Sequence, residues 1–135
     1  MKELKILATL ENFTHVVEYI EENLLYSNCD VKLSTQMLIA VEEIYVNIAK
    51  YAYSADIGDV TIKISVDEDI TIIFIDHGML FDPSMIADPD ISLPAKERKI
   101  GGLGIFMVKN IMDTFEYKRE DGQNILTMKK KLEIS

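Results

Sequence analysis

Three short segments of the chain carry residue types that could do chemistry together. The first contains Glu43 and Asn47, four residues apart, with Tyr51 one further turn along. In a helix, residues at this spacing share one face. An amide oxygen is a suitable ligand for Mg²⁺, and a carboxylate one turn away can orient or deprotonate a hydroxyl or a water. The same spacing also fits a solvated glutamate beside a tolerated polar residue.

The second segment is the apolar run ITIIFID, which ends in Asp76 and is followed by Gly78. An aspartate there can accept a hydrogen bond from an exocyclic amine of a ligand base, and a glycine lets the backbone approach a ring closely. Phe81 could pack nearby. The alternative is an ordinary strand exit, in which the aspartate bonds to its own backbone. We interpret His77 as a surface residue, because no second histidine lies at ligand spacing.

The third segment places Gly101, Gly102 and Gly104 at the mouth of a predicted helix. Free N–H groups and the positive end of the helix dipole favour a phosphate there. The segment is neither a Walker A loop nor a dinucleotide fingerprint. We interpret Arg98 as a phosphate contact and Lys99 as solvated. A flexible junction between loop and helix would look the same in sequence.

The elements that must position these segments follow from hydrophobic periodicity. Apolar residues at helical spacing predict helices over residues 11–28, 33–53 and 103–112. Runs of β-formers bounded by turn residues predict strands over residues 3–10, 60–66, 70–76, 114–119 and 124–133. We expect Ser34 to cap the second helix, the first strand to form an edge, and the strand ending in Asp76 to be central.

This order of elements predicts an α+β fold. Strands that pair mostly as hairpins, with helices early and late, favour a two-layer α/β sandwich with the helices on one face of a mixed, mostly antiparallel sheet. The 135 residues fit one domain, spanning 1–135. Residues 77–100 show no periodicity and contain three prolines. We therefore expect a functional loop, a lid over about residues 82–100.

Composition excludes several classes of function. The formal net charge of −9 repels nucleic acid, so we expect no nucleic-acid partner. No apolar run is long enough to span a membrane, and we expect no membrane association. The single cysteine, Cys29, excludes a disulfide within the chain and fits a reducing cytoplasm.

Taken together and in order, the motifs resemble a known superfamily. The chain carries E-x-x-x-N with A-Y following, then D-x-G-x-x-F-D-P after a strand, and then G-G-L-G-I-F-M-V-K-N-I-M-D. This arrangement resembles the GHKL (Bergerat-fold) ATPases. It is most similar to the anti-sigma-factor serine/threonine protein kinases (HATPase_c_2 type), whose ending Tyr117–Lys130 matches well. The resemblance covers nearly the whole chain.

The resemblance implies roles for individual residues. Glu43 would be the general base, Asn47 the Mg²⁺ ligand, and Asp76 the partner of the adenine amino group beside Gly78. The lid and the three glycines would hold the phosphates of ATP. Further expected ligand contacts are Lys50, Tyr51, Phe81, Arg98 and Leu103. The chain departs from the family at Tyr51, where many relatives carry histidine, and in the bulky residues of 79–81.

The resemblance also implies a function. Such a protein transfers the γ-phosphate of ATP to a serine or threonine of a STAS-type anti-anti-sigma partner, and otherwise sequesters a sigma factor, often as a homodimer. Two other functions fit the same motifs. One is a nucleotide-gated module that binds a protein without phosphorylating it, and the other is a simple ATPase.

Overall fold

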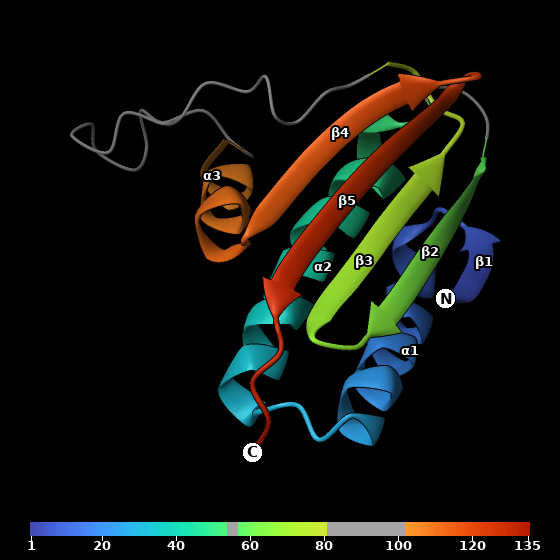
Figure 1. The fold of residues 1–135 in the computed structure, drawn as a ribbon. Coiled ribbons are helices and arrows are strands. Elements are labelled where there is room, and N and C mark those ends of the chain that lie inside the picture. Colours follow the sequence, from blue (N-terminus) through green and yellow to red (C-terminus); the bar gives the residue numbers. More distant parts are fainter. Residues whose placement is uncertain (54–56, 81–101) are drawn as a thin grey trace.

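The helices of the chain lie on one face of a single sheet, as Figure 1 shows. The computed structural model describes residues 1–53, 57–80 and 102–135. The described strands are β1 (Lys2–Leu7), β2 (Asp59–Val66), β3 (Asp69–Asp76), β4 (Thr114–Glu120) and β5 (Gln123–Lys131). They form a five-stranded sheet in the order β1-β2-β3-β5-β4. The α+β sandwich, the edge position of β1 and the central position of β3 are therefore confirmed.

Every described strand pairing is antiparallel, so the expectation of a mixed sheet is wrong. The connections give the reason. Two α-helices lie between β1 and β2. The chain runs back along the first helix and forward along the second, so that β2 starts at the end of β1 and runs antiparallel to it. Strands β3 and β4 run the same way, because each pairs antiparallel with β5, which lies between them (Figure 1). The two parallel strands are therefore not neighbours.

The predicted helices are present, with shifted ends. They are α1 (Phe13–Tyr26), α2 (Val31–Tyr51) and α3 (Gly102–Ile111), and a short 3₁₀ helix that was not predicted, η1 (Leu10–Asn12), precedes α1. The first predicted strand is shorter than expected, because the chain turns into η1 at Leu10. The prediction of Ser34 as a cap is wrong. Helix α2 begins three residues earlier, after Asp30, whose carbonyl oxygen accepts a hydrogen bond from the Ser34 N–H at 2.8 Å.

The core lies between the sheet and the helices. Alternate residues of β2, β3 and β5 point towards the helices and are buried, as period-two patterning requires. They pack against buried apolar residues of all three α-helices, including Val16, Ile20, Met37, Val41, Ile44, Ile105 and Val108. Asp76 and Asn124 continue the same inner face. They are the only buried polar side chains in the described part of the chain.

No helix among the described residues is long and apolar enough to cross a membrane.

Tyr45 joins α2 to the connection between β1 and α1. Its side chain is fully buried, and its hydroxyl donates to the Thr9 carbonyl oxygen at 2.6 Å. Its ring stacks on Phe13, with 5.9 Å between ring centroids. Burial raises the pKa of the Tyr45 hydroxyl above its ordinary value of 10.0. This residue therefore fixes the helix that carries Glu43 and Asn47 against the rest of the fold.

We expect Tyr45→Phe to lower the free energy of unfolding by about 1 kcal/mol at pH 7, because the partly buried Thr9 carbonyl loses its donor. The difference in free energy of unfolding between wild type and the variant should become smaller as the pH rises above 10. Wild-type Tyr45 keeps its proton in the folded state while the same residue ionises in the unfolded chain, so wild type loses stability through this residue and the variant lacks that loss. Urea unfolding at several pH values measures both effects. Tyr26→Phe, at a residue 87% exposed, is the control, and a gap that does not narrow would contradict the assignment.

Candidate functional site

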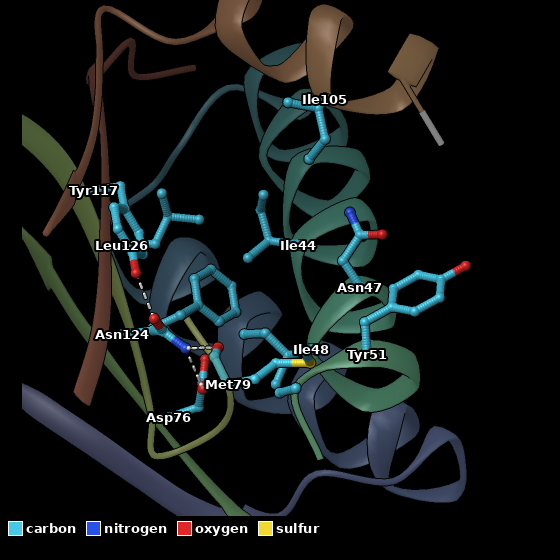
Figure 2. A pocket seen from close by; sticks show the side chains of 12 residues that line it. Ile44, Asn47, Ile48, Tyr51, Asp76, Met79, Ile105, Tyr117, Asn124 and Leu126 are labelled. Atoms are coloured by element: carbon cyan, nitrogen blue, oxygen red, sulfur yellow. Dashed lines mark hydrogen bonds between the residues drawn. The ribbon is translucent and has the colours of Figure 1, made fainter. Parts of the chain in front are cut away.

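A cavity opens between helix α2 and the inner face of the sheet, with α3 at one end (Figure 2). It encloses about 480 Å³ of empty space, its open mouth included. Its walls come from α2, the turn after it, β3, the segment after β3, α3, β4 and β5. The lining residues are Ile44, Asn47, Ile48, Tyr51, Ala52, Phe74, Asp76, Met79, Ile105, Tyr117, Asn124 and Leu126.

The cavity is mainly apolar, with a few polar groups on opposite sides. Asn47 and Tyr51 stand on the α2 side, and Asp76 and Asn124 stand on the sheet side (Figure 2). An apolar slot with few polar groups suits a flat ring that carries hydrogen-bonding substituents. The predicted residues Asn47, Tyr51 and Asp76 are thus brought together, although they lie on different elements.

Asp76 is the buried acid of this cavity, with 4% of its surface exposed. Its Oδ1 accepts hydrogen bonds from the Gly78 N–H at 2.8 Å and from Asn124 Nδ2 at 2.9 Å. The bond from the Gly78 N–H closes a local turn, which is what an aspartate at an ordinary strand exit would form. It uses only one oxygen. Among the described residues no group bonds to Asp76 Oδ2. This oxygen is not fully buried, unlike the Tyr19 hydroxyl, which is buried without a partner. A ligand donor can therefore reach Asp76 Oδ2.

Gly78 is required by packing as well as by any ligand. A Cβ at this position would lie 2.2 Å from the backbone oxygen of Ala52, at the end of α2. The same oxygen accepts the Met79 N–H at 2.9 Å. The segment after β3 is therefore attached to the end of α2. This close approach holds the two walls of the cavity at a set distance.

His77 is exposed, as the sequence analysis expected of a surface residue, and its hydrogen-bond partners are protein groups. Its backbone N–H donates to the Tyr53 hydroxyl at 2.9 Å, and Tyr53 donates to the Asp59 carbonyl oxygen at 2.6 Å. Burial raises the pKa of Tyr53 above 10.0. His77 Nε2 lies 3.1 Å from Gln123 Nε2. Among the described residues, no group of three or more His, Cys, Asp or Glu could hold a metal.

Glu43 is half-buried and lies against α3 rather than in open solvent. A Cβ built on Gly104 would stand 2.0 Å from Glu43 Oε2. The carboxylate of Glu43 therefore occupies the space that the glycine leaves. The first and third predicted segments meet at this point, with Asn47 one turn further along α2.

The remaining predicted residues fall into two groups. Gly102 begins α3, and Leu103 follows it in the first turn. Lys50 is exposed and does not line the cavity. The predicted contacts Phe81, Arg98 and Gly101, with the lid at 82–100, lie outside the described residues.

Sequence reasoning missed several cavity residues, above all Asn124. Its amide also donates to the Met79 carbonyl oxygen at 2.8 Å, and its Oδ1 accepts from the Tyr117 hydroxyl. One signal could have found it. Asn124, Leu126 and Met128 are alternate residues of β5, so all three lie on the buried, apolar face of that strand. A polar residue on that face needs a buried partner.

The family model of the histidine kinase-like ATPase domain matches residues 6–130 of the chain. Curated relatives named serine-protein kinase RsbW, from Bacillus cereus and Bacillus mycoides, are 32% and 31% identical to it over 98 residues. These matches cover 69% of this chain and 61% of each relative. The chain thus spans less than two thirds of the length of these relatives.

Two solved structures are similar to the chain in fold. A crystal structure of the RsbU and RsbW domains of a Mycobacterium tuberculosis protein has a TM-score of 0.64 at 17% identity, over 98% of this chain and 33% of that chain. The histidine kinase AdeS of Acinetobacter baumannii has a TM-score of 0.53 at 12% identity, over 98% of this chain and 69% of that chain. At these identities the likeness shows the fold alone.

We expect Gly78→Ala to lower the free energy of unfolding by about 1–3 kcal/mol, because the new Cβ meets a backbone atom that cannot turn away. Gly104→Ala is the matched control. Its Cβ meets only the mobile end of Glu43, and alanine favours a helix over glycine, so stability should hold or rise. Urea unfolding of both variants measures this contrast. Equal losses in the two variants would show that the approach of residue 78 to α2 is not the constraint.

Proposed function

The chain belongs to the histidine kinase-like ATPase domain family, and on that premise we propose that it is an ATP-dependent serine/threonine protein kinase of the anti-sigma-factor type. One observation carries the proposal. A buried aspartate with an accessible oxygen lies on one side of an apolar cavity, and a helix bearing Glu43 and Asn47 lies on the other. The names of the Bacillus relatives support the kinase activity.

The base of ATP would enter the apolar part of the cavity. Ile48, Phe74 and Leu126 offer apolar surface there, and burying such surface against a ring is favourable. Asp76 Oδ2 would accept a hydrogen bond from the exocyclic amine of adenine. Tyr51, which is 55% exposed at the edge of the cavity, would cover the ligand from the α2 side.

The donor set fits a magnesium ion carried in with the nucleotide. Asn47 presents an amide group on the cavity wall, and such an oxygen is a suitable ligand for this hard cation. Magnesium usually takes one or two protein ligands and fills its other positions with waters and phosphate oxygens. When bound, it would neutralise charge on the phosphates. Asn47 would set where that charge lies relative to Glu43.

Glu43 would act as the general base. It would orient the hydroxyl of the partner's serine or threonine and take its proton as the oxygen attacks the γ-phosphorus. The bond from that phosphorus to the β-phosphate oxygen breaks, and ADP leaves. Phosphoryl transfer needs mainly positioning and charge neutralisation, so this small set of groups is sufficient. Gly102 and Gly104, in the first turn of α3, would allow phosphates to approach the helix N-terminus.

The partners come from the family resemblance. We propose that the phosphate acceptor is a STAS-type anti-anti-sigma protein and that the chain sequesters a sigma factor when it is not phosphorylating. A cytoplasmic location and a homodimer belong to the same proposal.

We expect Glu43→Gln to reduce phosphate transfer at least about a hundredfold while ATP affinity changes little, because the amide keeps the shape and loses the base. The assay incubates γ-labelled ATP, Mg²⁺ and candidate STAS proteins with each variant and follows label on the partner. Glu42→Gln, on the neighbouring exposed residue, is the control. ATP binding without transfer or hydrolysis by wild type would favour the gated module. Hydrolysis without labelled protein would favour the ATPase, and no binding would refute all three.

We expect Gly104→Ala to slow transfer about tenfold, because its Cβ must displace the Glu43 carboxylate. The effect should depend on Glu43. In the Glu43→Gln background the same alanine should cost far less, since the base is already absent. A double-mutant cycle on the transfer rate measures this coupling. Losses that simply multiply would show that residue 104 acts on the phosphates and not through Glu43.

A further inference from the structure

The outer face of the sheet, which is turned away from the helices, takes no part in the cavity. The helices lie on the inner face, and no described helix covers the outer one (Figure 1). Successive side chains of a strand point to opposite faces, so the residues between the buried positions of β2, β3 and β5 point outward. Among them are Ile73, Ile75 and Ile125, which are half-buried. Covering these three side chains with another surface would be favourable.

Charge distinguishes the outer face from the rest of the molecule. Five of the 23 acidic side chains of the chain point outward from the strands, and these are Glu3, Asp59, Asp69, Glu116 and Glu120. Five of the 14 basic side chains do the same, and these are Lys5, Lys63, Lys118, Lys129 and Lys131. Arg119 is not among them, because it is paired with Asn124 and donates to that residue on the inner face. The outer face is therefore neutral, and the rest of the chain carries the whole net charge of −9.

Two neighbouring rows of residues cross the strands of the outer face with opposite charges at their ends. The strand register forms an acid-ended row from Glu3, Lys63, Ile73, Thr127 and Glu116. The next row is base-ended and consists of Lys5, Thr61, Ile75, Ile125 and Lys118. Paired residues of adjacent strands share a face and lie close together. The two rows thus surround the isoleucines with charges of alternating sign.

We propose that two copies of the chain form a homodimer through this outer face. The two-fold axis lies between the two sheets, at right angles to the strands. Such an axis lays each strand on its own equivalent and reverses its direction, so the acid-ended row of one copy lies on the base-ended row of the other. Glu3 then faces the partner's Lys5, and Glu116 faces the partner's Lys118. Ile73 lies over the partner's Ile75 at the centre.

The register disfavours the other face-to-face arrangement, in which the two-fold axis runs along the strands. That axis would lay β1 of one copy on β4 of the other. Glu3 would then face the partner's Glu116, and Lys5 would face the partner's Lys118. Like charges placed against each other oppose association. The charged ends of the two rows therefore select one orientation, and in it the face is complementary to itself, as a two-fold interface requires.

In the single chain both of these lysines already have an acidic neighbour. Lys118 Nζ lies 2.7 Å from Glu120 Oε2, and Lys5 Nζ lies 3.9 Å from Asp59 Oδ2. These ion pairs are exposed and contribute little to stability. An ammonium group has three donors, so each lysine can contact the partner's glutamate as well.

The outer face has about the size that a dimer needs. Five strands of six to nine residues cover roughly 24 by 25 Å, a flat area of about 600 Å² before the relief of the side chains is added. A standard interface buries about 800 Å² per partner. Two sheets packed face to face with aligned strands stand about 10 Å apart, a distance that lets side chains from both fill the space. The neutrality of the face lets two acidic chains approach each other there.

This interface gives a surface to the homodimer of the proposed function, and the inference rests on that part of the proposal alone. The cavity lies on the inner face of each sheet, so both cavities of the dimer face away from the partner copy (Figure 1). Each copy can therefore bind its ligand and its protein substrate without opening the dimer. ATP binding and phosphate transfer are measured separately from the association of the two chains.

The test measures the mass of the full chain by analytical ultracentrifugation at micromolar concentrations and low salt, where wild type should be a dimer. In Glu116→Lys the new lysine would face the partner's Lys118, and in Lys118→Glu two glutamates would face each other. Each variant alone should dimerise about tenfold more weakly, because two facing pairs per dimer become repulsive. An equal mixture of the two variants should restore the dimer, since every lysine at these positions then faces a glutamate of the other chain.

Glu21→Lys is the matched control, because it changes the net charge by the same amount at an exposed position of α1 and should leave the dimer unchanged. Circular dichroism checks the fold of each variant, and Glu3→Lys with Lys5→Glu repeats the test at the other end of the rows if a β4 variant does not fold. A monomeric wild type, single variants that dimerise as well as wild type, or a mixture no better than its components would overturn the inference. An intact dimer that transfers no phosphate to any candidate partner would count against the proposed kinase activity alone.

Discussion

The hydrogen bond between Asp76 and Asn124 is the interaction on which the rest of the site depends. A buried carboxylate is costly unless donors surround it, and the strand register supplies the first donor from the neighbouring strand. The turn at Gly78 supplies the second. Both bonds end on one oxygen, so the other stays available to a ligand. At the polar end of an otherwise apolar sheet face, one oxygen of Asp76 is thus hydrogen-bonded within the protein and the other can still accept a bond from a ligand.

The fold brings the second half of the site to this acid by packing helix on sheet. Tyr45 and the apolar stripe of α2 fix that helix over β3 and β5, and this sets Asn47 and Tyr51 across the cavity from Asp76. Helix α3 then closes one end, where Gly104 receives the carboxylate of Glu43. Gly78 and Gly104 are therefore each explained by a neighbouring atom of the protein, whether or not they also approach a ligand.

Sequence reasoning recovered the elements and the residues that stand at their ends. Helical spacing put Glu43 and Asn47 on one face, and the end of an apolar strand marked Asp76. It could not recover the order of the strands, because β5 pairs with β3 only through contacts between residues 48 (Asp76 and Asn124) to 62 (Asp69 and Lys131) positions apart. Tyr117, Arg119 and the partners of Asn124 were missed for this reason. Their roles depend on which strand lies beside β3, and a pattern along the chain does not carry that information.

The insertion of β5 between β3 and β4 has a consequence for the protein during its synthesis. The strand that completes the acid's environment is the last one made, so a nascent chain that stops short of it presents Asp76 without Asn124 and β3 with an unpaired edge. The bare edge of an apolar strand invites pairing with other chains. Because β4 pairs only with β5 among the described strands, β5 is the strand that joins β4 to β3 and covers the edge of β3.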